Sequence, residues 1–307
     1  MNLRSKVRLN FIDTPFQVEK YFLGLLEKKY EVIRDDTPEF LIFTHIGQRH
    51  RLYNCTKIFY SQEVYPPDWG ECDYTIHSCW FPGERALHLP IFAFGRGLAP
   101  LLGSRGGENP WHRRFCVFLA GYDDSSVRNR REFLEALGRY RKVDSFGKAL
   151  NNTGIKAEDG YYPKIDLLAG YKFHIAFENK QRPGWCTEKL YDAFAAGTVP
   201  IYWGDPRVED YFNPQAFINA ENFRCWETLV EYIAYLDQNE DLYTKYLAAS
   251  PFPGREAPTI FQEERIMAFF EKIFSSQEKP VAQRRWFFPL TKWRLAKRNK
   301  RPGEQGE

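Results

Sequence analysis

The sequence lacks any run of about 18 apolar residues, the length that would cross a membrane. Its first six residues contain no apolar stretch of the kind found in secretory signals, and they lead directly into a predicted strand. We therefore expect a cytoplasmic protein with reduced thiols, rather than a secreted or membrane-spanning one.

Metal-binding patterns are also missing. The six cysteines are scattered, no Cys-x-x-Cys pair occurs, and no pair of histidines lies near them at the spacing of zinc ligands. Cys72 and Cys79 are close enough in sequence for a disulfide, but buried free thiols are the preferred interpretation. No Asp-x-Asp motif occupies a metal-like position, so no metal site is expected.

The net charge of +3 is small but unevenly distributed. Residues 284–307 carry eight Lys and Arg side chains against two Glu, which gives this tail +6 and leaves −3 for the remainder. A nucleic-acid-binding protein would more often carry positive charge on its folded body, so nucleic acid is not an expected partner. Bulky apolar residues lie between the cations of the tail. It either binds an anionic membrane surface, as a peripheral protein on the inner membrane face would, or forms a disordered solubilising segment.

Strand and helix patterns alternate along the chain, which predicts parallel βαβ units and an α/β fold. A composition rich in Gly and Pro at about 96–111 predicts a linker. We therefore predict an N-terminal domain at 1–105, a C-terminal domain at 106–278 and a basic aromatic tail at 279–307. The predicted strands lie at 7–12, 30–33, 40–43, 57–60, 115–119, 142–147, 173–177 and 199–204, and the predicted helices at 15–28, 126–140, 187–196, 226–238 and 263–274.

One strand–loop–helix unit contains the triplet Thr187-Glu188-Lys189. Thr187 is a predicted N-cap whose hydroxyl would accept a hydrogen bond from a first-turn amide. A helix N-terminus attracts phosphate oxygens, and Lys189 adds a full charge suited to a diphosphate. Glu188 would accept hydrogen bonds from sugar hydroxyls of the same ligand. Taken alone, the triplet is equally typical of a capped helix with surface charges.

The wider sequence is more specific, because several motifs follow one another in order: FYSQE (59–63), DY (73–74), YRKVDSFG (140–147), YKFHIAFEN (171–179), WCTEK (185–189), VPIYWG (199–204), DYFNP (210–214) and AFIN (216–219). Together they resemble the α-1,3-fucosyltransferases, glycosyltransferase family ten, and most of all the bacterial members. The resemblance implies a GT-B arrangement of two Rossmann-like domains with an interdomain cleft. It implies that GDP-fucose binds the C-terminal domain and the acceptor glycan the N-terminal one.

The resemblance also assigns roles to residues. Glu63 matches the family's catalytic base in an inverting mechanism, and independently it is a carboxylate just past an apolar strand, where α/β folds place their sites. Arg130 matches the diphosphate-binding arginine, although Arg128 and Arg131 leave the register open. The remaining donor-binding positions fall on Asn179, Trp185, Glu188 and Lys189.

The acceptor is expected to be an N-acetyllactosamine-like glycan bound by loops at 44–51 and 64–70. Tyr65, Trp69 and Trp80 would either stack on a sugar or pack in the core. Linkage is expected to be α-1,3, with α-1,4 left open. No cofactor is required beyond the donor, and stimulation by a divalent metal is left open. The alternatives are transfer of another GDP-linked deoxysugar, or a non-catalytic glycan- or nucleotide-binding protein.

Overall fold

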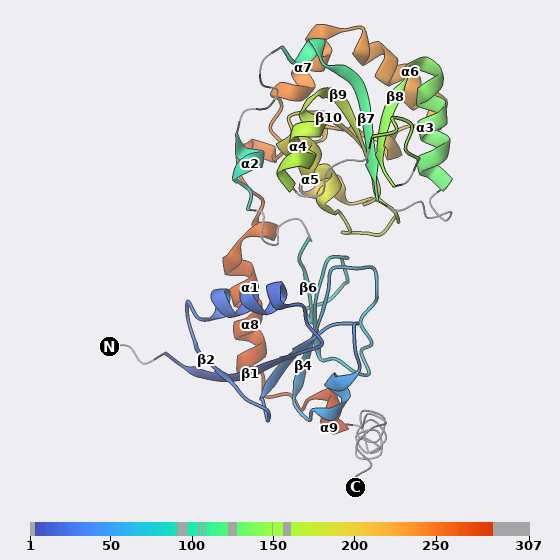
Figure 1. The fold of residues 1–307 in the computed structure, drawn as a ribbon. Coiled ribbons are helices and arrows are strands. Elements are labelled where there is room, and N and C mark those ends of the chain that lie inside the picture. The colour runs from blue at the N-terminus through green and yellow to red at the C-terminus, as the bar shows by residue number, and fades with distance from the viewer. Residues whose placement is uncertain are drawn as a thin grey trace. The chain divides into compact units, whose positions relative to one another are not determined.

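The computed structural model describes residues 4–90, 97–103, 105, 107, 109–121, 128–148, 150–155 and 161–284. The chain divides into two compact units. The N-terminal unit comprises residues 1–89 and 259–307, and the C-terminal unit comprises residues 90–258. Each unit contains one parallel sheet with helices packed on it (Figure 1).

The N-terminal unit is built on a six-stranded sheet in the order β2-β1-β3-β4-β5-β6, with every neighbouring pair parallel. Alternate residues of the first strand (Val7, Leu9, Phe11) are buried, as the period of two requires. Helix α1 (Phe16–Leu26) connects the first two strands and places Phe22 against Tyr60, with ring centroids 5.4 Å apart. The strands are β1 (Lys6–Ile12), β2 (Glu31–Arg34), β3 (Phe40–Phe43), β4 (Thr56–Ser61), β5 (Tyr74–His77) and β6 (Ala86–His88).

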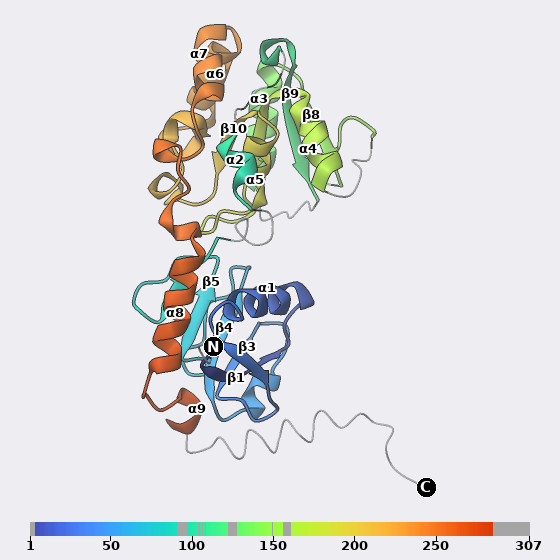
Figure 2. The same cartoon turned by 90° about the vertical axis from the view of Figure 1, so that its left-hand side faces the viewer.

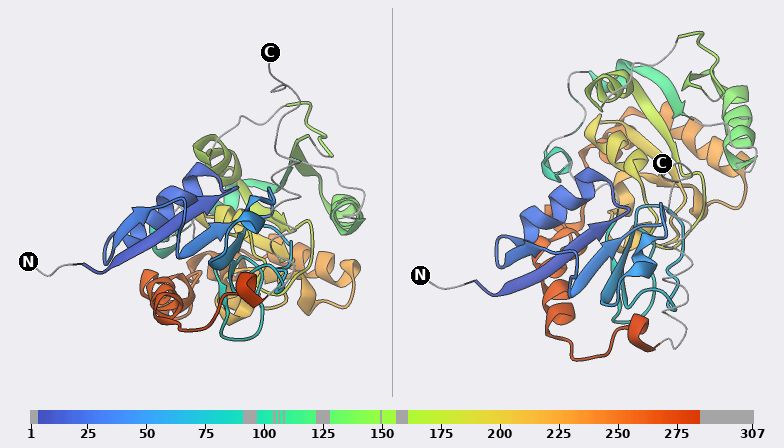
Figure 3. Two further views of the ribbon diagram at one scale, coloured as in Figure 1. Left: turned by 90° about the horizontal axis from the view of Figure 1, so that it is seen from below. Right: turned by 60° about the horizontal axis from the view of Figure 1, so that its bottom comes forward.

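The C-terminal end of the chain returns to this unit through α8 (Glu263–Ser275) and α9 (Val281–Arg284). The apolar face of α8 packs against α1 and against β5. The ring centroids of Phe270 and Phe22 in α1 are 5.7 Å apart, and those of Phe269 and Tyr74 in β5 are 6.0 Å apart. Figure 2 shows α1 and α8 beside the strands, and both views in Figure 3 show the orange-red α8 next to the blue N-terminal elements.

This return corrects the predicted domain boundaries of 105/106 and 278/279. The structure divides at residues 89/90 and again at 258/259. An amphipathic helix must cover an apolar surface, but its sequence does not indicate which sheet supplies that surface. Proximity in sequence favoured the second sheet for residues 263–274, whereas the apolar partners lie on the first.

The C-terminal unit contains a five-stranded sheet in the order β11-β10-β9-β7-β8. Apolar residues of α3 and α6 form a core on one face, and α4 and α5 cover the other (Figure 1). The strands are β7 (Arg114–Ala120), β8 (Val143–Gly147), β9 (Tyr171–Phe177), β10 (Val199–Trp203) and β11 (Ile218–Asn219). The helices are α2 (Ala99–Leu102), α3 (Arg128–Tyr140), α4 (Tyr161–Ala169), α5 (Glu188–Ala195), α6 (Trp226–Asp237) and α7 (Glu240–Ala248).

The α/β class and the two Rossmann-like domains are confirmed. The sequence did not indicate β5, β6, α4 or α7, and the predicted linker contains α2 near its start. All six cysteines are free, so no disulfide joins Cys72 to Cys79, and Cys225 is exposed rather than buried. The basic tail from residue 285 onward lies outside the described residues, and its membrane binding stays a prediction.

Candidate functional site

The central strand of the C-terminal unit, β9, ends at a fully buried carboxylate. Every residue of β9 is buried, and the next residue, Glu178, is 0% exposed. The Glu178 amide donates to the Trp203 carbonyl at 2.8 Å, which extends the β9–β10 pairing by one residue. The chain therefore holds a charged group at the carboxyl edge of the sheet, where α/β folds place their ligand sites.

Glu178 is the acceptor for the start of α5. The Thr187 amide donates to Oε1 at 2.7 Å, and the Thr187 hydroxyl donates to Oε2 at 2.7 Å. The Lys189 ammonium donates to Oε2 at 2.9 Å and to the Thr187 hydroxyl at 2.8 Å. The prediction that the Thr187 hydroxyl accepts from a first-turn amide is wrong, because the Thr187 side chain makes no such cap hydrogen bond. The hydroxyl donates to Glu178 and accepts from Lys189.

A close backbone approach makes room for this carboxylate. Gly204 has φ of 155°, and a Cβ atom there would lie 2.4 Å from Glu178 Cγ. Only glycine fits this position without displacing the buried side chain. The sequence places Glu178 in a motif, but it does not indicate that this carboxylate accepts hydrogen bonds from both Thr187 and Lys189.

Glu188 and Lys189 form the exposed side of the same network. Their Oε1 and Nζ atoms are 3.5 Å apart, and the side chains are 32% and 20% exposed. Burial by itself would raise the pKa of Glu188, but the nearby charges of Lys189 and Lys164 lower it to about 2. Burial by itself would lower the pKa of Lys189, but the carboxylates of Glu178 and Glu188 raise it. Both groups are therefore ionised at neutral pH.

Arg130 also reaches the end of β9. It is 7% exposed, and its Nε and Nη2 atoms donate to the Phe177 carbonyl at 3.2 and 2.7 Å. Arg131, one residue further on, is exposed. The side chain of Arg128 lies outside the described residues. Of the described arginines at the start of α3, Arg130 therefore lies at the strand end that carries Glu178.

The other two predicted donor residues differ in exposure. Asn179 directly follows Glu178 and is exposed. Trp185 is only 3% exposed, so its ring offers little surface to a ligand in this structure. The structure thus brings Arg130, Asn179, Glu188 and Lys189 to one strand end, and their contact with a donor stays a prediction.

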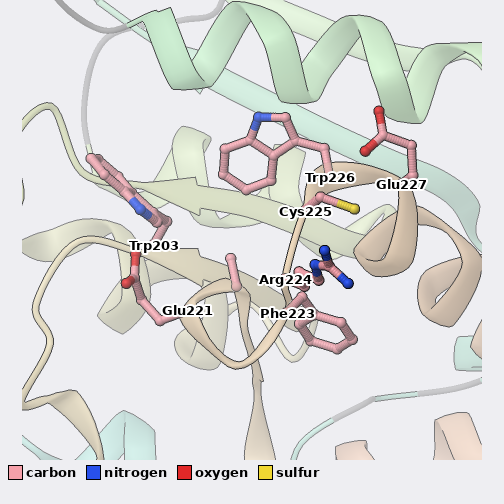
Figure 4. A pocket seen from close by; sticks show the side chains of 8 residues that line it. Trp203, Glu221, Phe223, Arg224, Cys225, Trp226 and Glu227 are labelled. Carbon is pink, nitrogen blue, oxygen red and sulfur yellow. The ribbon is translucent and has the colours of Figure 1, made fainter.

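A pocket that the sequence did not indicate lies at the same edge of this sheet (Figure 4). Its volume is about 330 Å³. Trp203, at the end of β10, lines one side, and the segment leading into α6 lines the other. The Cys225 thiol and the backbone at the start of α6 lower the pKa of Glu227. The lining residues are Trp203, Ala220, Glu221, Phe223, Arg224, Cys225, Trp226 and Glu227.

In the N-terminal unit, the predicted base Glu63 follows the carboxyl end of β4 and is exposed. A side-chain turn fixes its backbone, since the Ser61 hydroxyl accepts from the Glu63 amide at 3.1 Å and donates to the Glu63 carbonyl at 3.0 Å. Two residues on, the Tyr65 carbonyl lies 2.7 Å from His77 Nε2. Because His77 Nδ1 accepts from the Cys79 amide at 2.8 Å, Nε2 carries the proton and donates.

Among the described residues, no three His, Cys, Asp or Glu side chains are grouped so as to hold a metal ion. Independence of metal stays a prediction. Within the same residues, no helix has the length and apolar character needed to span a bilayer.

Comparison with known families identifies both units. A model described as "Glycosyltransferase family 10 (fucosyltransferase) C-term" matches residues 112–256. A model described as "Alpha-(1,3)-fucosyltransferase FucT N-terminal domain" matches residues 8–95.

Individual relatives match over shorter regions. The α-(1,3)-fucosyltransferase FucT of Helicobacter pylori is 33% identical over 173 residues, covering 55% of this chain and 35% of that protein. Alpha-(1,3)-fucosyltransferase 4 of Bos taurus is 33% identical over 153 residues, covering 49% and 35%. GDP-fucose protein O-fucosyltransferase 3 of Xenopus tropicalis is 34% identical over 127 residues, covering 39% and 27%. The chain thus spans about a third of the length of these relatives.

Solved structures support the fold over nearly the whole chain. A crystal structure of an α1,3-fucosyltransferase with GDP matches with a TM-score of 0.75 at 22% identity, covering 91% of this chain and 93% of that one. The two family models and these relatives agree with the family that the sequence motifs indicate. The chain belongs to glycosyltransferase family 10, the fucosyltransferase family.

Proposed function

We propose that the chain transfers L-fucose from GDP-fucose to a hydroxyl of a GlcNAc-containing glycan, forming an α-1,3 linkage with inversion at the anomeric carbon. The observation that carries the proposal is the group of ionised side chains at the end of β9, with Arg130, Glu188 and Lys189 around the buried Glu178. Support comes also from solved structures of an α1,3-fucosyltransferase with GDP and with GDP-fucose.

In this proposal, Lys189 binds the diphosphate. Its ammonium has three donors, two of which contact Glu178 and Thr187 at 2.9 and 2.8 Å. The third contact, to Glu188, is longer at 3.5 Å. A phosphate oxygen would replace this longest contact and would leave Glu188 to accept hydrogen bonds from ligand hydroxyls. Arg130 and Asn179 complete the donor contacts.

Glu63 acts as the general base. It takes the proton of the acceptor hydroxyl while that oxygen attacks the anomeric carbon from the face opposite GDP. The bond from the anomeric carbon to the diphosphate oxygen breaks, and its electron pair leaves with GDP. The charge on the departing diphosphate is stabilised by Lys189 and Arg130, so the residues named here supply the chemistry without a metal ion.

The sugar and the acceptor are separate parts of the proposal. Another GDP-linked deoxysugar would use the same diphosphate contacts. A GDP-fucose protein O-fucosyltransferase is among the similar proteins, so family membership alone leaves a protein acceptor as the competing candidate. A non-catalytic binding protein would need no general base, so the exposed carboxylate of Glu63 favours an enzyme over that alternative.

The test is incubation with GDP-fucose and N-acetyllactosamine, followed by measurement of free GDP and of the fucosylated product, with and without EDTA. We expect both products in a one-to-one ratio, unaffected by EDTA. GDP release without glycan product would indicate donor hydrolysis alone. Transfer only from a different GDP-deoxysugar, or only to a peptide, would replace the stated donor or acceptor, and binding without turnover would favour the non-catalytic alternative.

A further inference from the structure

The exposed apolar side chains of the N-terminal unit gather at one edge of its sheet. Four are strongly exposed: Phe16 (73%), Ile46 (64%), Tyr65 (52%) and Trp80 (40%). They follow the carboxyl ends of β1, β3, β4 and β5, which are consecutive neighbours in the sheet order. Within the described part of this unit, no other large apolar side chain is exposed to this degree.

This arrangement needs an explanation, because contiguous exposed apolar groups on a folded unit usually mark a binding surface. Carboxyl ends of parallel strands lie at the same edge of a sheet, so the four side chains belong to the edge that carries Glu63. We call this edge, defined by Phe16, Ile46, Tyr65 and Trp80, the apolar rim.

The centre of the apolar rim is already ordered. The rings of His45 and Tyr65 stack with centroids 4.2 Å apart and planes 25° apart. His45 follows β3 and Tyr65 follows β4, so the stack joins two loops. The backbone of Tyr65 is also held in place, because His77 Nε2 donates a hydrogen bond of 2.7 Å to the Tyr65 carbonyl.

Trp69, the other aromatic residue of the predicted acceptor loop at 64–70, has a structural role. Its side chain is partly buried against the cluster of Phe43, Phe59 and Cys72, and the Arg85 guanidinium lies over the ring, 4.7 Å from its centroid. Trp69 is therefore less available to a ligand than Tyr65, which remains half exposed beside its stacked partner.

We infer that the His45–Tyr65 stack is the platform on which a pyranose ring of the acceptor glycan rests, with Ile46 and Trp80 flanking it. This inference rests on the proposed function and specifies its acceptor subsite. A pyranose presents a face of polarised C–H groups that suits the negative face of an aromatic ring, while its hydroxyls stay hydrated at the edge. Glu63 is two residues from Tyr65, with its backbone held by Ser61. A sugar on the stack would therefore rest on the loop that also carries the proposed base.

The test compares Tyr65→Ala with Tyr65→Phe and with Tyr235→Ala, which removes an equally exposed tyrosine (58%) from α6 of the other unit. Binding of N-acetyllactosamine is measured by ligand-observed NMR, and the acceptor KM by product formation. We expect Tyr65→Ala to raise the Kd and the KM about tenfold, the size expected for one aromatic contact. Tyr65→Phe should recover most of the loss, and His45→Ala should weaken binding in the same direction. GDP affinity should be the same in Tyr65→Ala as in the wild type.

Unchanged glycan binding in Tyr65→Ala, or equal weakening by Tyr235→Ala, would overturn the platform. So would binding of a Ser/Thr peptide but not of the disaccharide by the wild type. If Tyr65→Ala does not fold, Tyr65→Leu keeps the apolar volume without the ring and carries the same prediction. A wild type that binds glycan through Tyr65 without turnover would retain the platform and remove the transferase. Turnover that is unchanged by substitution of Tyr65 and His45 would retain the transferase and remove the platform.

Discussion

The two sheets present opposite kinds of carboxyl edge. At the end of β9, a carboxylate with 0% exposure is surrounded by hydrogen-bond donors, and the charges around it pair with one another. At the end of β4, Glu63 is exposed, and the ordered contacts around it involve backbone groups and stacked rings. One edge is a network of buried charge, and the other carries exposed apolar side chains beside the exposed carboxylate of Glu63.

The physical demands on each edge explain the difference. A group that binds a diphosphate must hold cations in place before the ligand arrives, and a buried counter-ion such as Glu178 compensates for their desolvation. A general base must reach the acceptor hydroxyl and exchange protons, which an exposed carboxylate does readily. Charge removal should therefore impair stability at β9 but turnover at β4.

Of the substitutions considered, Glu63→Gln should reduce the rate of transfer most. We expect transfer to fall by roughly a hundredfold or more, in the range of general base catalysis, with GDP affinity and thermal stability unchanged. Initial-rate kinetics, calorimetric GDP binding and a melting curve measure the three quantities. Glu31→Gln, at an exposed carboxylate on β2, is the matched control. Near-normal turnover of Glu63→Gln would remove Glu63 from the mechanism.

Lys189→Met should instead destabilise the C-terminal unit, because it leaves Glu178 buried without its cation. We expect a loss of about 3 kcal/mol in the free energy of unfolding, together with weaker GDP binding. Urea denaturation and calorimetry measure these, and Lys245→Met on the exposed surface of α7 is the control. Adding Glu178→Gln to Lys189→Met should recover part of the stability. A double variant no more stable than the single one would contradict the ionic account.

A fall in pH should lower the free energy of unfolding of both units, so the two edges do not differ in this respect. Burial lowers the pKa of His77 to about 4 and that of His174 to about 3. Between these values and the ordinary pKa near 6.5, the unfolded chain binds protons that the folded chain excludes, so stability present above pH 6.5 is lost as pH falls toward 4. For His77 alone, the expected loss by pH 5 is about 2 kcal/mol. Urea denaturation at pH 7 and pH 5 measures it, and equal stability at both values would show that these histidines are not held neutral.

The smallest effect concerns thiol reactivity. Cys225 is exposed at the pocket beside α6, while the other five cysteines are buried. Burial raises the pKa of Cys55 and of Cys72 to about 12, which further reduces their reactivity. One equivalent of a thiol reagent should therefore label the native protein, at Cys225, and Cys225→Ser should abolish the labelling. Slower labelling in the presence of GDP would extend the donor site to this pocket, whereas labelling of several cysteines would contradict the burial pattern.

Strong local patterns predicted most of the fold. The alternation of Val7, Leu9 and Phe11, and the helical spacing of apolar residues in α1 and α6, depend only on neighbouring residues. Short elements escaped prediction: β6 has three residues, and α7 directly follows α6. Their stability comes from packing against elements that are distant in sequence.

The sequence by itself determined the α/β class, the order of the motifs and therefore the family, since these depend on residue identity and spacing. It also singled out Glu63, Arg130, Glu188 and Lys189 as candidate residues. Only the tertiary structure decided that α8 belongs to the first sheet, that the Thr187 hydroxyl donates to Glu178, and that Tyr65 rather than Trp69 is exposed. The reason is physical, because burial and hydrogen-bond partners depend on which surfaces meet after folding.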